Sequence, residues 1–422
     1  MIEDPIVVTG LGAVSPLGVG VDVNWRRLTE GRSGVVANTR FDVTDYACKI
    51  AGLVPTKPDD PEGFDPLDFV DQKDLKKTDT FIHYALAATQ EAVEQSGWAP
   101  DAETEKSRTA VIIATGVGGL PAITNAVNVV QERGPRRLSP FVVPSFLPNL
   151  AAGHVSIRYG FKGPIGCPVT ACAASAQAIG DGMRLILSGE ADVAVCGGSD
   201  ACVDPVGIGG FGAARALSTG FNDEPQRASR PFDRQHDGFV LSEGAATIVI
   251  ERLSHALARG ANPIAVLAGY GTSSDAYHVT AGCPDGEGAA RAMRLALQMA
   301  GIGPEAIDYV NAHSTSTPVG DAAEIAAIRA VFPERGKDLA VTSTKSATGH
   351  LLGAAGALEA VYSILALRDG VVPPGLNIDD PEPDADVFDL APNAAKSKQL
   401  DYVLSNGFGF GGVNASLVFR RS

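Results

Sequence analysis

The sequence of 422 residues predicts an α/β protein with largely parallel strands, built from two similar halves. Short runs of β-branched and other apolar residues alternate with segments of helical periodicity along the chain, as they do in α/β folds. The second half repeats the plan of the first, because both contain a strand that runs into a glycine turn, at 193–198 and 402–412. We therefore expect two domains, residues 1–260 and 261–422.

Four apolar runs in the first half have the composition of buried strands. They cover residues 6–12, 109–116, 191–198 and 245–251. Apolar residues recur at helical spacing in three segments, which predicts helices at 65–96, 173–187 and 256–260. Prolines break 141–152 into loop and short helix, and the polar stretch 214–243 is expected to be a loop. The glycines that end the first run lack the third glycine of a dinucleotide-binding turn, which argues against a nucleotide site there.

The second half alternates in the same way. Strands are expected at 264–271, 307–313, 339–342 and 402–412, and helices at 288–300 and 321–331. A third helix, rich in glycine and alanine, is expected to follow His350 and to end near Leu367. The alternation predicts that the strands of this half also pair mostly in parallel.

The composition excludes several classes of protein. Hydrophobic residues make up 45% of the chain and charged residues 20%, which indicates an ordered globular protein. The net charge of −15 argues against a general binder of nucleic acid or membrane surfaces. Six cysteines without CxxC pairs and seven dispersed histidines specify neither a disulfide scaffold nor a zinc site. With no signal sequence and no membrane-spanning run, we expect a cytoplasmic protein.

Cys172 opens a segment rich in small residues that reads as a helix from Ala173 to Leu187. A thiol in the first turn of a helix lies among unpaired backbone N–H groups, at the positive end of the helix dipole, and both favour the thiolate. The small neighbours suggest that another molecule must approach the thiol closely. The segment therefore allows two interpretations, a nucleophile or a buried structural cysteine.

Three further stretches carry chemically active residues at the ends of expected strands. They contain His313, Lys345 with His350, and the turn at 408–410. Active sites in α/β proteins gather where strands end, so these residues can meet Cys172 in space. A cysteine nucleophile needs groups that stabilise its thiolate and an oxyanion, and two imidazole N–H groups can polarise a thioester carbonyl. Taken singly, each histidine could be structural, and Lys345 could be an ordinary surface lysine.

Four motifs in the same order resemble those of β-ketoacyl-acyl-carrier-protein synthases. They are VTACAAS at 169–175, NAHSTSTP at 311–318, TKSATGH at 344–350 and NGFGFGG at 406–412. Residues 230–233 and 237–239 also match, and the likeness runs from Ile6 to about Phe419. The Cys-His-His set resembles the elongating type II branch, whereas primer-type synthases use Cys-His-Asn and thiolases use a second cysteine.

The resemblance implies a thiolase-like fold of five layers, α-β-α-β-α, made of two βαβαβαββ halves and usually found as a homodimer. It implies a ping-pong condensation in which Cys172 takes an acyl chain from an acyl carrier protein. Malonyl carrier protein then loses CO2, His313 and His350 hold the enolate, and a 3-ketoacyl chain two carbons longer results. The phosphopantetheine arrives on the carrier protein, so no separate cofactor or metal is expected.

The resemblance also assigns roles to other residues. The backbone N–H groups of Cys172 and Phe410 would form the oxyanion hole, and Lys345 would orient the site with Glu359 as its buried acidic support. The remaining assignments are Phe408 and Phe410 as gate, Val117 and Phe211 as acyl-pocket lining, and Thr315 and Thr317 as pantetheine contacts. The expected docking residues for the acidic carrier protein are Lys73, Lys76, Lys77, Arg136, Arg137 and Arg215. On residue type alone, a solvated helix face is the default interpretation of the three lysines.

The sequence departs from the family pattern at three places. Ser314 replaces a glycine in the pantetheine tunnel, where a side chain could conflict with a positive φ or a close approach. Ser242 lies in an altered GEGAG-like run, and Ala173 and Ala174 replace more polar neighbours of the nucleophile. Three functions stay open: fatty-acid elongation, the same chemistry in a polyketide or other specialised pathway, and a non-catalytic carrier-binding subunit. The intact Cys172 argues against the third, and against the chain-length-factor relatives that lack the nucleophile.

Overall fold

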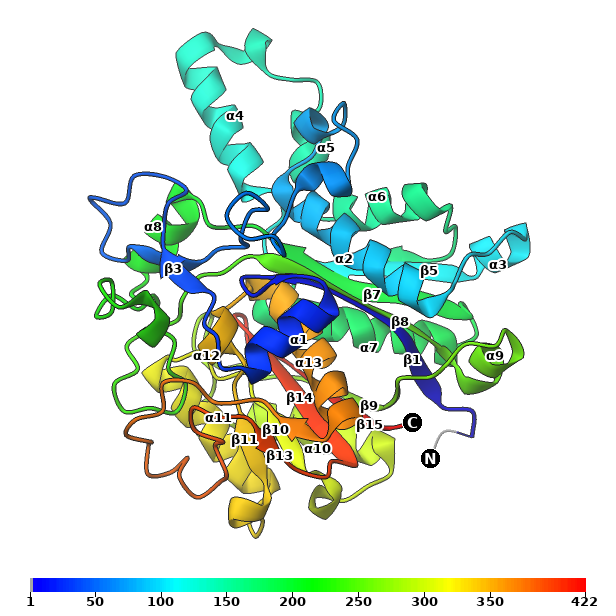
Figure 1. Cartoon of the computed structure of the whole chain (residues 1–422), viewed down its shortest axis with the longest axis vertical. Coiled ribbons are helices and arrows are strands. Elements are labelled where there is room, and N and C mark those ends of the chain that lie inside the picture. The colour runs from blue at the N-terminus through cyan, green and yellow to red at the C-terminus, as the bar shows by residue number, and fades with distance from the viewer. Residues whose placement is uncertain (1–2) are drawn as a thin grey trace.

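The computed structural model describes residues 3–422, which form five alternating layers of helix and sheet (Figure 1). The principal strands are β1 (Ile6–Ser15), β5 (Thr109–Ala114), β7 (Val193–Asp200), β8 (Gly244–Arg252), β9 (Ala265–Ser274), β10 (Tyr309–Asn311), β11 (Ala340–Thr342), β14 (Tyr402–Gly409) and β15 (Val413–Arg421). Short strands are β2 (Gly18–Val19), β3 (Val35–Ala37), β4 (Ile50–Gly52), β6 (Ile165–Gly166), β12 (Val371–Val372) and β13 (Lys396–Ser397).

Helices cover both faces of the sheet system and fill its centre. The longer helices are α1 (Val21–Thr29), α2 (Thr80–Ser96), α4 (Leu120–Arg133), α6 (Leu150–Tyr159), α7 (Ala174–Leu187), α8 (Pro205–Ala213), α10 (Glu287–Ala300), α11 (Pro318–Val331) and α13 (Ala355–Asp369). The shorter ones are α3 (Glu103–Ser107), α5 (Val142–Phe146), α9 (Leu253–Ala258) and α12 (Lys345–Thr348). Within the described part of the chain, no helix combines the length and the apolar character that a membrane span requires.

Three hydrophobic clusters define the layers. One packs α2 and α6 on the outer face of β5, β7 and β8, and another packs α10 and α11 on the outer face of β10, β14 and β15. The central cluster contains α7 and α13, which lie between the inner faces of the two halves of the sheet. Alternation along β7 shows the division, because Val195 faces the outer cluster and Ala194 and Cys196 face the central one.

The strands pair in the order β11-β10-β14-β15-β9-β1-β8-β7-β5-β6. The two halves of this order meet at a short pairing of β1 with β9, from Ile6 opposite Leu267 to Val8 opposite Ala265. Only the flanks are parallel, where β10 pairs with β11 and β14 and β5 pairs with β6 and β7. The expectation of largely parallel strands is therefore wrong for the middle of the order. Antiparallel pairing follows there because strands such as β14 and β15 are joined by a tight turn without a crossover helix.

The repeated plan of the two halves is visible in the turns that precede α7 and α13. Each helix follows a single 3-10 turn, Ala171–Ala173 before α7 and Leu352–Ala354 before α13. Both turns begin on a non-glycine residue with positive φ, 49° at Ala171 and 51° at Leu352. The shared distortion bends the chain sharply at equivalent points of the two halves, and these two turns contribute the site described below.

The helix expected at 65–96 begins later than predicted. Residues 66–77 contain two 3-10 turns, Pro66–Asp68 and Leu75–Lys77, and α2 begins at Thr80. The carboxylate of Asp79 accepts a hydrogen bond from the backbone N–H of Phe81 and so caps the helix at that point. The helices α4 and α8 were not predicted, because α4 leaves apolar side chains exposed and α8 contains several glycines.

Candidate active site

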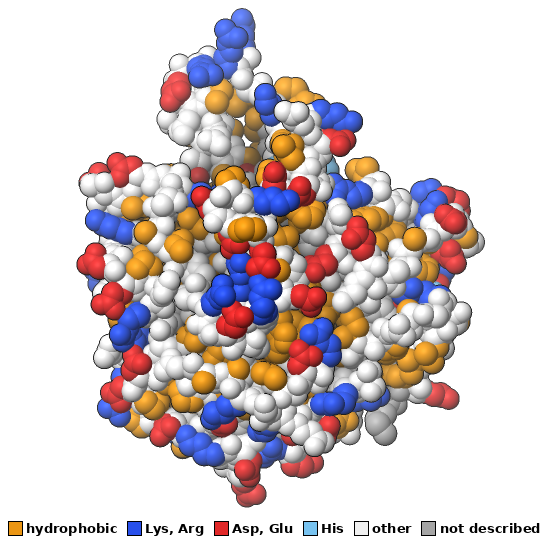
Figure 2. Space-filling view, in the orientation of Figure 1, with side chains coloured by type: hydrophobic (Ala, Val, Ile, Leu, Met, Phe, Trp, Pro, Cys, Tyr) orange, Lys and Arg blue, Asp and Glu red, His pale blue; other side chains and the backbone are white. Residues whose placement is uncertain are grey.

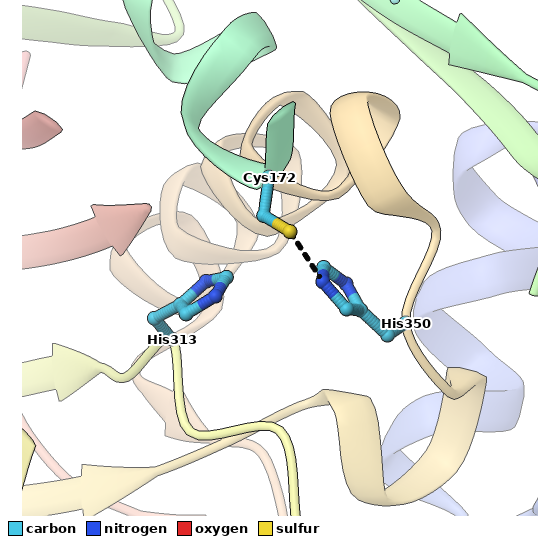
Figure 3. Close-up of side chains that lie close together, drawn as sticks. All are labelled: Cys172, His313 and His350. Carbon is cyan, nitrogen blue, oxygen red and sulfur yellow. Dashed lines mark hydrogen bonds between the residues drawn. The ribbon is translucent and has the colours of Figure 1, made fainter. Parts of the chain in front are cut away.

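Cys172 lies in the strained 3-10 turn just before α7, where the positive φ of Ala171 turns the chain. The carbonyl oxygen of Thr170, just before the turn, accepts a hydrogen bond from the backbone N–H of Ala173. Backbone strain of this kind persists where surrounding packing holds it, and it is common at active sites. The turn presents the Cys172 side chain between two imidazole rings (Figure 3).

His350 is hydrogen-bonded to the nucleophile, with its Nε2 atom 2.9 Å from Cys172 Sγ. Its backbone runs beside Leu241, because His350 N donates to Val240 O at 2.8 Å and Ser242 N donates to His350 O at 3.0 Å. The ring of Phe239 packs edge-on against the imidazole, with centroids 5.4 Å apart. The loop segment 239–242 therefore fixes both the backbone and the ring of His350.

His313 follows β10, and its ring lies on the other side of the thiol, 5.4 Å from the His350 ring between centroids. The buried carboxylate of Glu324 fixes the backbone at His313. It accepts hydrogen bonds from the backbone N–H groups of His313 at 2.9 Å and of Ser314 at 2.5 Å. Asn406, within β14, donates to the same carboxylate at 3.0 Å. Glu324 on α11 therefore ties the His313 loop to β14.

Burial sets the protonation states of these three groups. It raises the pKa of Cys172 to about 12, against the smaller lowering effect of the Lys345 ammonium. The helix N-terminus was expected to favour the thiolate. Burial in the protein interior disfavours the thiolate more than the backbone N–H groups of the turn stabilise it, so the resting form is the neutral thiol. Burial also holds the pKa of His313 and of His350 well below its ordinary value, and Lys345 lowers both further. Both imidazoles are neutral at neutral pH.

Lys345 and Glu359 form a buried ion pair behind the histidines, with 1% and 3% of their side chains exposed. Burial raises the pKa of Glu359 to about 7, and the Lys345 ammonium opposes that rise. The hydroxyl of Ser229 donates to the Lys345 carbonyl at 2.6 Å and fixes the start of α12. The Lys345 ammonium acts electrostatically on Cys172 and on both histidines, although Lys345 does not line the cavity.

The β14–β15 turn packs directly on the nucleophile turn. A Cβ on Gly409 would lie 2.7 Å from Thr170 O and 3.2 Å from Cys172 N, so this close approach requires glycine. The backbone N–H groups of Phe410 and Cys172 both point at the sulfur and favour its charged form. These are the two N–H groups expected to form an oxyanion hole, and both lie close to the nucleophile.

A cavity of about 600 Å³ opens over Cys172. Its walls contain three of the four expected catalytic side chains, the expected gate and acyl-pocket residues, the expected pantetheine contacts and one expected docking residue: Cys172, His313, His350, Phe408, Phe410, Val117, Phe211, Thr315, Thr317 and Arg215. The fourth expected catalytic residue, Lys345, does not line the cavity. The exposed fraction of Phe410 is 40%, so its ring stands at the mouth. Residues far apart in the sequence thus share one cavity.

The other expected docking residues lie outside the cavity, on the surface near α5 and the end of α4. They are Lys73, Lys76, Lys77, Arg136 and Arg137. The Lys77 ammonium lies 5.3 Å from the centroid of the Phe141 ring and 2.7 Å from Asp74. Figure 2 shows Lys and Arg side chains gathered at the tip of the projection that carries α4.

The side chains of the three sequence departures are all accommodated. Ser314 does not have a positive φ, and its hydroxyl donates to Glu324 Oε2 at 2.8 Å, which adds a donor to the carboxylate that holds His313. The hydroxyl of Ser242 fills the space beside Gly349. A Cβ added to Gly349 would lie only 2.0 Å from Ser242 Oγ. Ala173 and Ala174 are fully buried at the start of α7.

Two buried carboxylates in the supporting structure were missed from the sequence. Asp200 accepts the N–H groups of Gly116 and Gly353 at 2.8 and 2.7 Å, and so joins the turn after β5 to the turn before α13. Glu324 is the other. The signal for Glu324 was its spacing from Asp321, since acidic residues three apart share one helix face, and here both are buried.

His236 anchors the loop 214–243 against the start of α11, with its Nδ1 atom 2.9 Å from Asp321 Oδ2. Burial lowers the pKa of His236, but the hydrogen bond and charge of Asp321 outweigh it and raise the pKa above its ordinary value. The interaction therefore stabilises the fold fully below the unfolded pKa of about 6.5, and the stabilisation is lost as pH rises through the higher folded pKa.

We expect His236→Gln to lower the free energy of unfolding by about 1.5–3 kcal/mol at about pH 6, and by less at about pH 9. Urea denaturation at the two pH values measures the difference. Exposed His278, replaced in the same way, is the control and should leave both values unchanged within about 0.5 kcal/mol. An equal loss at both pH values would show that the His236 charge does not contribute.

Comparison with known proteins identifies the family. Residues 3–256 match the model of the Beta-ketoacyl synthase N-terminal domain, and residues 264–379 match that of the C-terminal domain. This chain belongs to the beta-ketoacyl synthase family. It is 47% identical over 416 residues to 3-oxoacyl-[acyl-carrier-protein] synthase 2 of Rhizobium meliloti (strain 1021), with 99% of this chain and 98% of that protein covered. It is also 47% identical over 430 residues to the mitochondrial 3-oxoacyl-[acyl-carrier-protein] synthase of Arabidopsis thaliana, with 98% and 92% covered.

Solved structures of ketosynthases share the fold over the whole chain. A beta-ketoacyl synthase from Burkholderia phymatum STM815 has a TM-score of 0.90 and 35% identity, with 99% of this chain and 100% of that chain covered. A type II PKS acyl-carrier protein in complex with its ketosynthase has a TM-score of 0.89 and 31% identity, with the same shares covered. The resemblance inferred from the four motifs and the thiolase-like fold class are thereby confirmed. The roles given to single residues and the division at 260 stay predictions.

Proposed function

We propose that this chain is an elongating 3-oxoacyl-[acyl-carrier-protein] synthase, which condenses malonyl carrier protein with an acyl chain held on Cys172. The observation that carries the proposal is the Cys172 thiol on a strained turn at the base of the cavity, 2.9 Å from His350 Nε2 and beside His313. Relatives 43–47% identical over nearly their whole length are named as such synthases.

The first half-reaction would load the acyl chain. Cys172 Sγ attacks the thioester carbonyl, its proton passes to His350 Nε2, and the N–H groups of Cys172 and Phe410 hold the oxyanion. The carrier's pantetheine thiol leaves with that proton, and an acyl-cysteine remains. Because the resting thiol is neutral and buried, we propose that proton transfer accompanies the attack and that no thiolate forms beforehand.

The second half-reaction would form the carbon–carbon bond. The malonyl carboxylate leaves as CO2, and its bonding electrons form an enolate. The enolate oxygen accepts a hydrogen bond from the His313 N–H and, once the ring proton of His350 has moved from Nδ1 to Nε2 by exchange with solvent, from the His350 N–H. The enolate carbon then attacks the acyl-cysteine carbonyl, and the Cys172 sulfur leaves and takes up a proton from solvent. Neutral imidazoles suit this role, because they can donate a hydrogen bond to the enolate. A positively charged imidazole would also bind the malonyl carboxylate before CO2 is lost, and would therefore stabilise the ground state as well.

The acyl and malonyl groups would arrive on an acyl carrier protein. Arg215 at the cavity wall and the basic residues near α4 and α5 support this docking, since the net charge of −15 makes positive side chains valuable for an acidic partner. Thr315 and Thr317 line the channel that a pantetheine arm would follow. Thiol and imidazole groups carry this chemistry, and we propose no cofactor beyond the carrier's phosphopantetheine.

We also propose a homodimer. Ile123, Val127 and Val130 leave an apolar stripe exposed on α4, which projects from the body of the molecule (Figure 1). The short strand β6 ends the sheet order, and the apolar side chains of Ile165 and Val169 are exposed at this edge. An open sheet edge beside exposed apolar residues is typical of a surface that pairs with a second copy. The cytoplasmic location stays a prediction of the sequence.

A specialised pathway remains the second candidate, with the same chemistry on another chain. A type II PKS ketosynthase shares the fold and 31% of the aligned residues, whereas the relatives named for 3-oxoacyl-[acyl-carrier-protein] synthesis share 43–47%. The higher identity favours fatty-acid elongation.

Incubation with a fatty-acyl carrier protein is expected to add one acyl group to Cys172. Peptide mass spectrometry locates the adduct, and Cys283→Ser is the matched control, because Cys283 is the other thiol in the described cavity wall and its replacement should leave the adduct unchanged. Absence of an adduct across short, long, unsaturated and branched acyl groups would refute the ketosynthase and favour the non-catalytic carrier-binding subunit. The preferred acyl group in that series separates fatty-acid elongation from a specialised pathway.

A further inference from the structure

The three reactive side chains of the site also match the ligand set of a transition metal. One sulfur and two imidazole nitrogens, from Cys172, His313 and His350, all lie within 4.8 Å of one another. Borderline-soft Zn²⁺ binds cysteine sulfur and histidine nitrogen, and sites with three protein ligands leave a fourth position open. We propose that Cys172, His313 and His350 form a Zn²⁺-binding site in which the metal excludes the acyl thioester.

The geometry needs little adjustment. Tetrahedral zinc with Zn–S of about 2.3 Å and Zn–N of about 2.0–2.1 Å places its ligand atoms about 3.3–3.6 Å apart. The observed separations are 2.9 Å between Cys172 Sγ and His350 Nε2 and at most 4.8 Å for the other pairs. Side-chain shifts of about 1 Å therefore bring the three ligand atoms around one ion.

The surroundings admit a cation. The 600 Å³ cavity reaches all three ligands, so an ion can enter and solvent can complete its coordination. The Lys345 ammonium acts electrostatically on all three groups, and it is paired with the Glu359 carboxylate, which offsets its repulsion of a second cation. When zinc binds, the Cys172 S–H bond breaks, the proton passes to solvent, and the sulfur lone pair forms the S–Zn bond.

The supporting groups limit the strength of this site. The Nδ1 atoms of both histidines have no hydrogen-bond partner among residues 3–422, whereas metal-binding histidines usually donate this N–H to an acceptor. We therefore expect an affinity about 10–100-fold below that of a site with such partners. Reversible inhibition follows, because the metal occupies the sulfur and both groups that would hold the enolate.

Cobalt titration tests the site without reference to condensation activity, so the result is independent of the proposed function. Co²⁺ is expected to bind in a 1:1 ratio and to give a near-ultraviolet thiolate-to-cobalt absorption that Zn²⁺ displaces and Mg²⁺ does not. The absorption should vanish in Cys172→Ala and in wild-type protein alkylated at Cys172 with iodoacetamide, which tests the thiol without a mutation. It should weaken at least about tenfold in His313→Ala and in His350→Ala.

Cys283→Ser is the control, because Cys283 is the other thiol in the described wall of the cavity. Unchanged cobalt binding in Cys283→Ser and protection of Cys172 from iodoacetamide by Zn²⁺ would establish the site. An absorption that survives alkylation of Cys172, that is lost in Cys283→Ser, or that never appears would overturn the proposal.

Discussion

His313→Ala is expected to slow the decarboxylation of malonyl carrier protein by about 10²–10³-fold. The His313 ring lies beside the thiol at the base of the cavity, where the enolate oxygen of the bound malonyl group would develop its charge. Removing a donor that acts on charge formed in the transition state lowers the rate constant and leaves substrate binding nearly unchanged. Release of labelled CO2 under single-turnover conditions measures the effect.

His350→Ala provides the internal comparison, because the two histidines differ in their contact with the nucleophile. His350 is hydrogen-bonded to Cys172 Sγ, so its loss should slow both acylation and decarboxylation. His313 should matter mainly for decarboxylation, and acylation of Cys172 should stay within about threefold of wild type in His313→Ala. The control is His278→Ala, because His278 is exposed in the loop at the cavity mouth. Unchanged CO2 release in either catalytic variant would contradict the assigned roles.

The strong local patterns of the sequence predicted most of the strands and the site motifs. Runs such as 109–116 and 191–198 became β5 and β7, and the helix expected at 288–300 is α10 within one residue. The site was predictable because Cys172, His313 and His350 each follow a recognisable strand or turn motif.

What the sequence could not reveal depends on contacts between distant segments. Antiparallel pairing in the middle of the sheet order depends on which strands become neighbours, and local periodicity does not record that. The backbone N–H groups at Cys172 do favour the thiolate, as expected, but burial of the thiol outweighs them. That loss of solvent is a tertiary effect, which a local sequence pattern does not record. Asp200 escaped notice because an isolated acidic residue gives no sign of the backbone N–H groups from which it will accept hydrogen bonds.

Lys345→Met is expected to lower the free energy of unfolding by about 3–5 kcal/mol, the second large effect. Lys345 and Glu359 have almost no exposed surface, so removal of the cation leaves a carboxylate buried without its partner. Urea denaturation followed by circular dichroism measures the loss. Lys57→Met is the matched control, because its ion pair with Asp68 is exposed and screened by solvent, so its loss should leave the free energy of unfolding almost unchanged.

The pH dependence of the variant separates loss of the charge pair from simple loss of packing. In the intact protein burial already raises the pKa of Glu359 to about 7, and removal of the opposing Lys345 charge raises it further. A carboxyl whose folded pKa exceeds its unfolded value stabilises the fold in its protonated form, and that stabilisation is lost as pH rises through the folded pKa. Lys345→Met should therefore be less destabilised at about pH 6 than at about pH 8. The double variant, which adds Glu359→Gln to Lys345→Met, should regain part of the lost free energy of unfolding and should show no such pH dependence. If both variants lose the same free energy of unfolding at both pH values, the effect is due to packing alone.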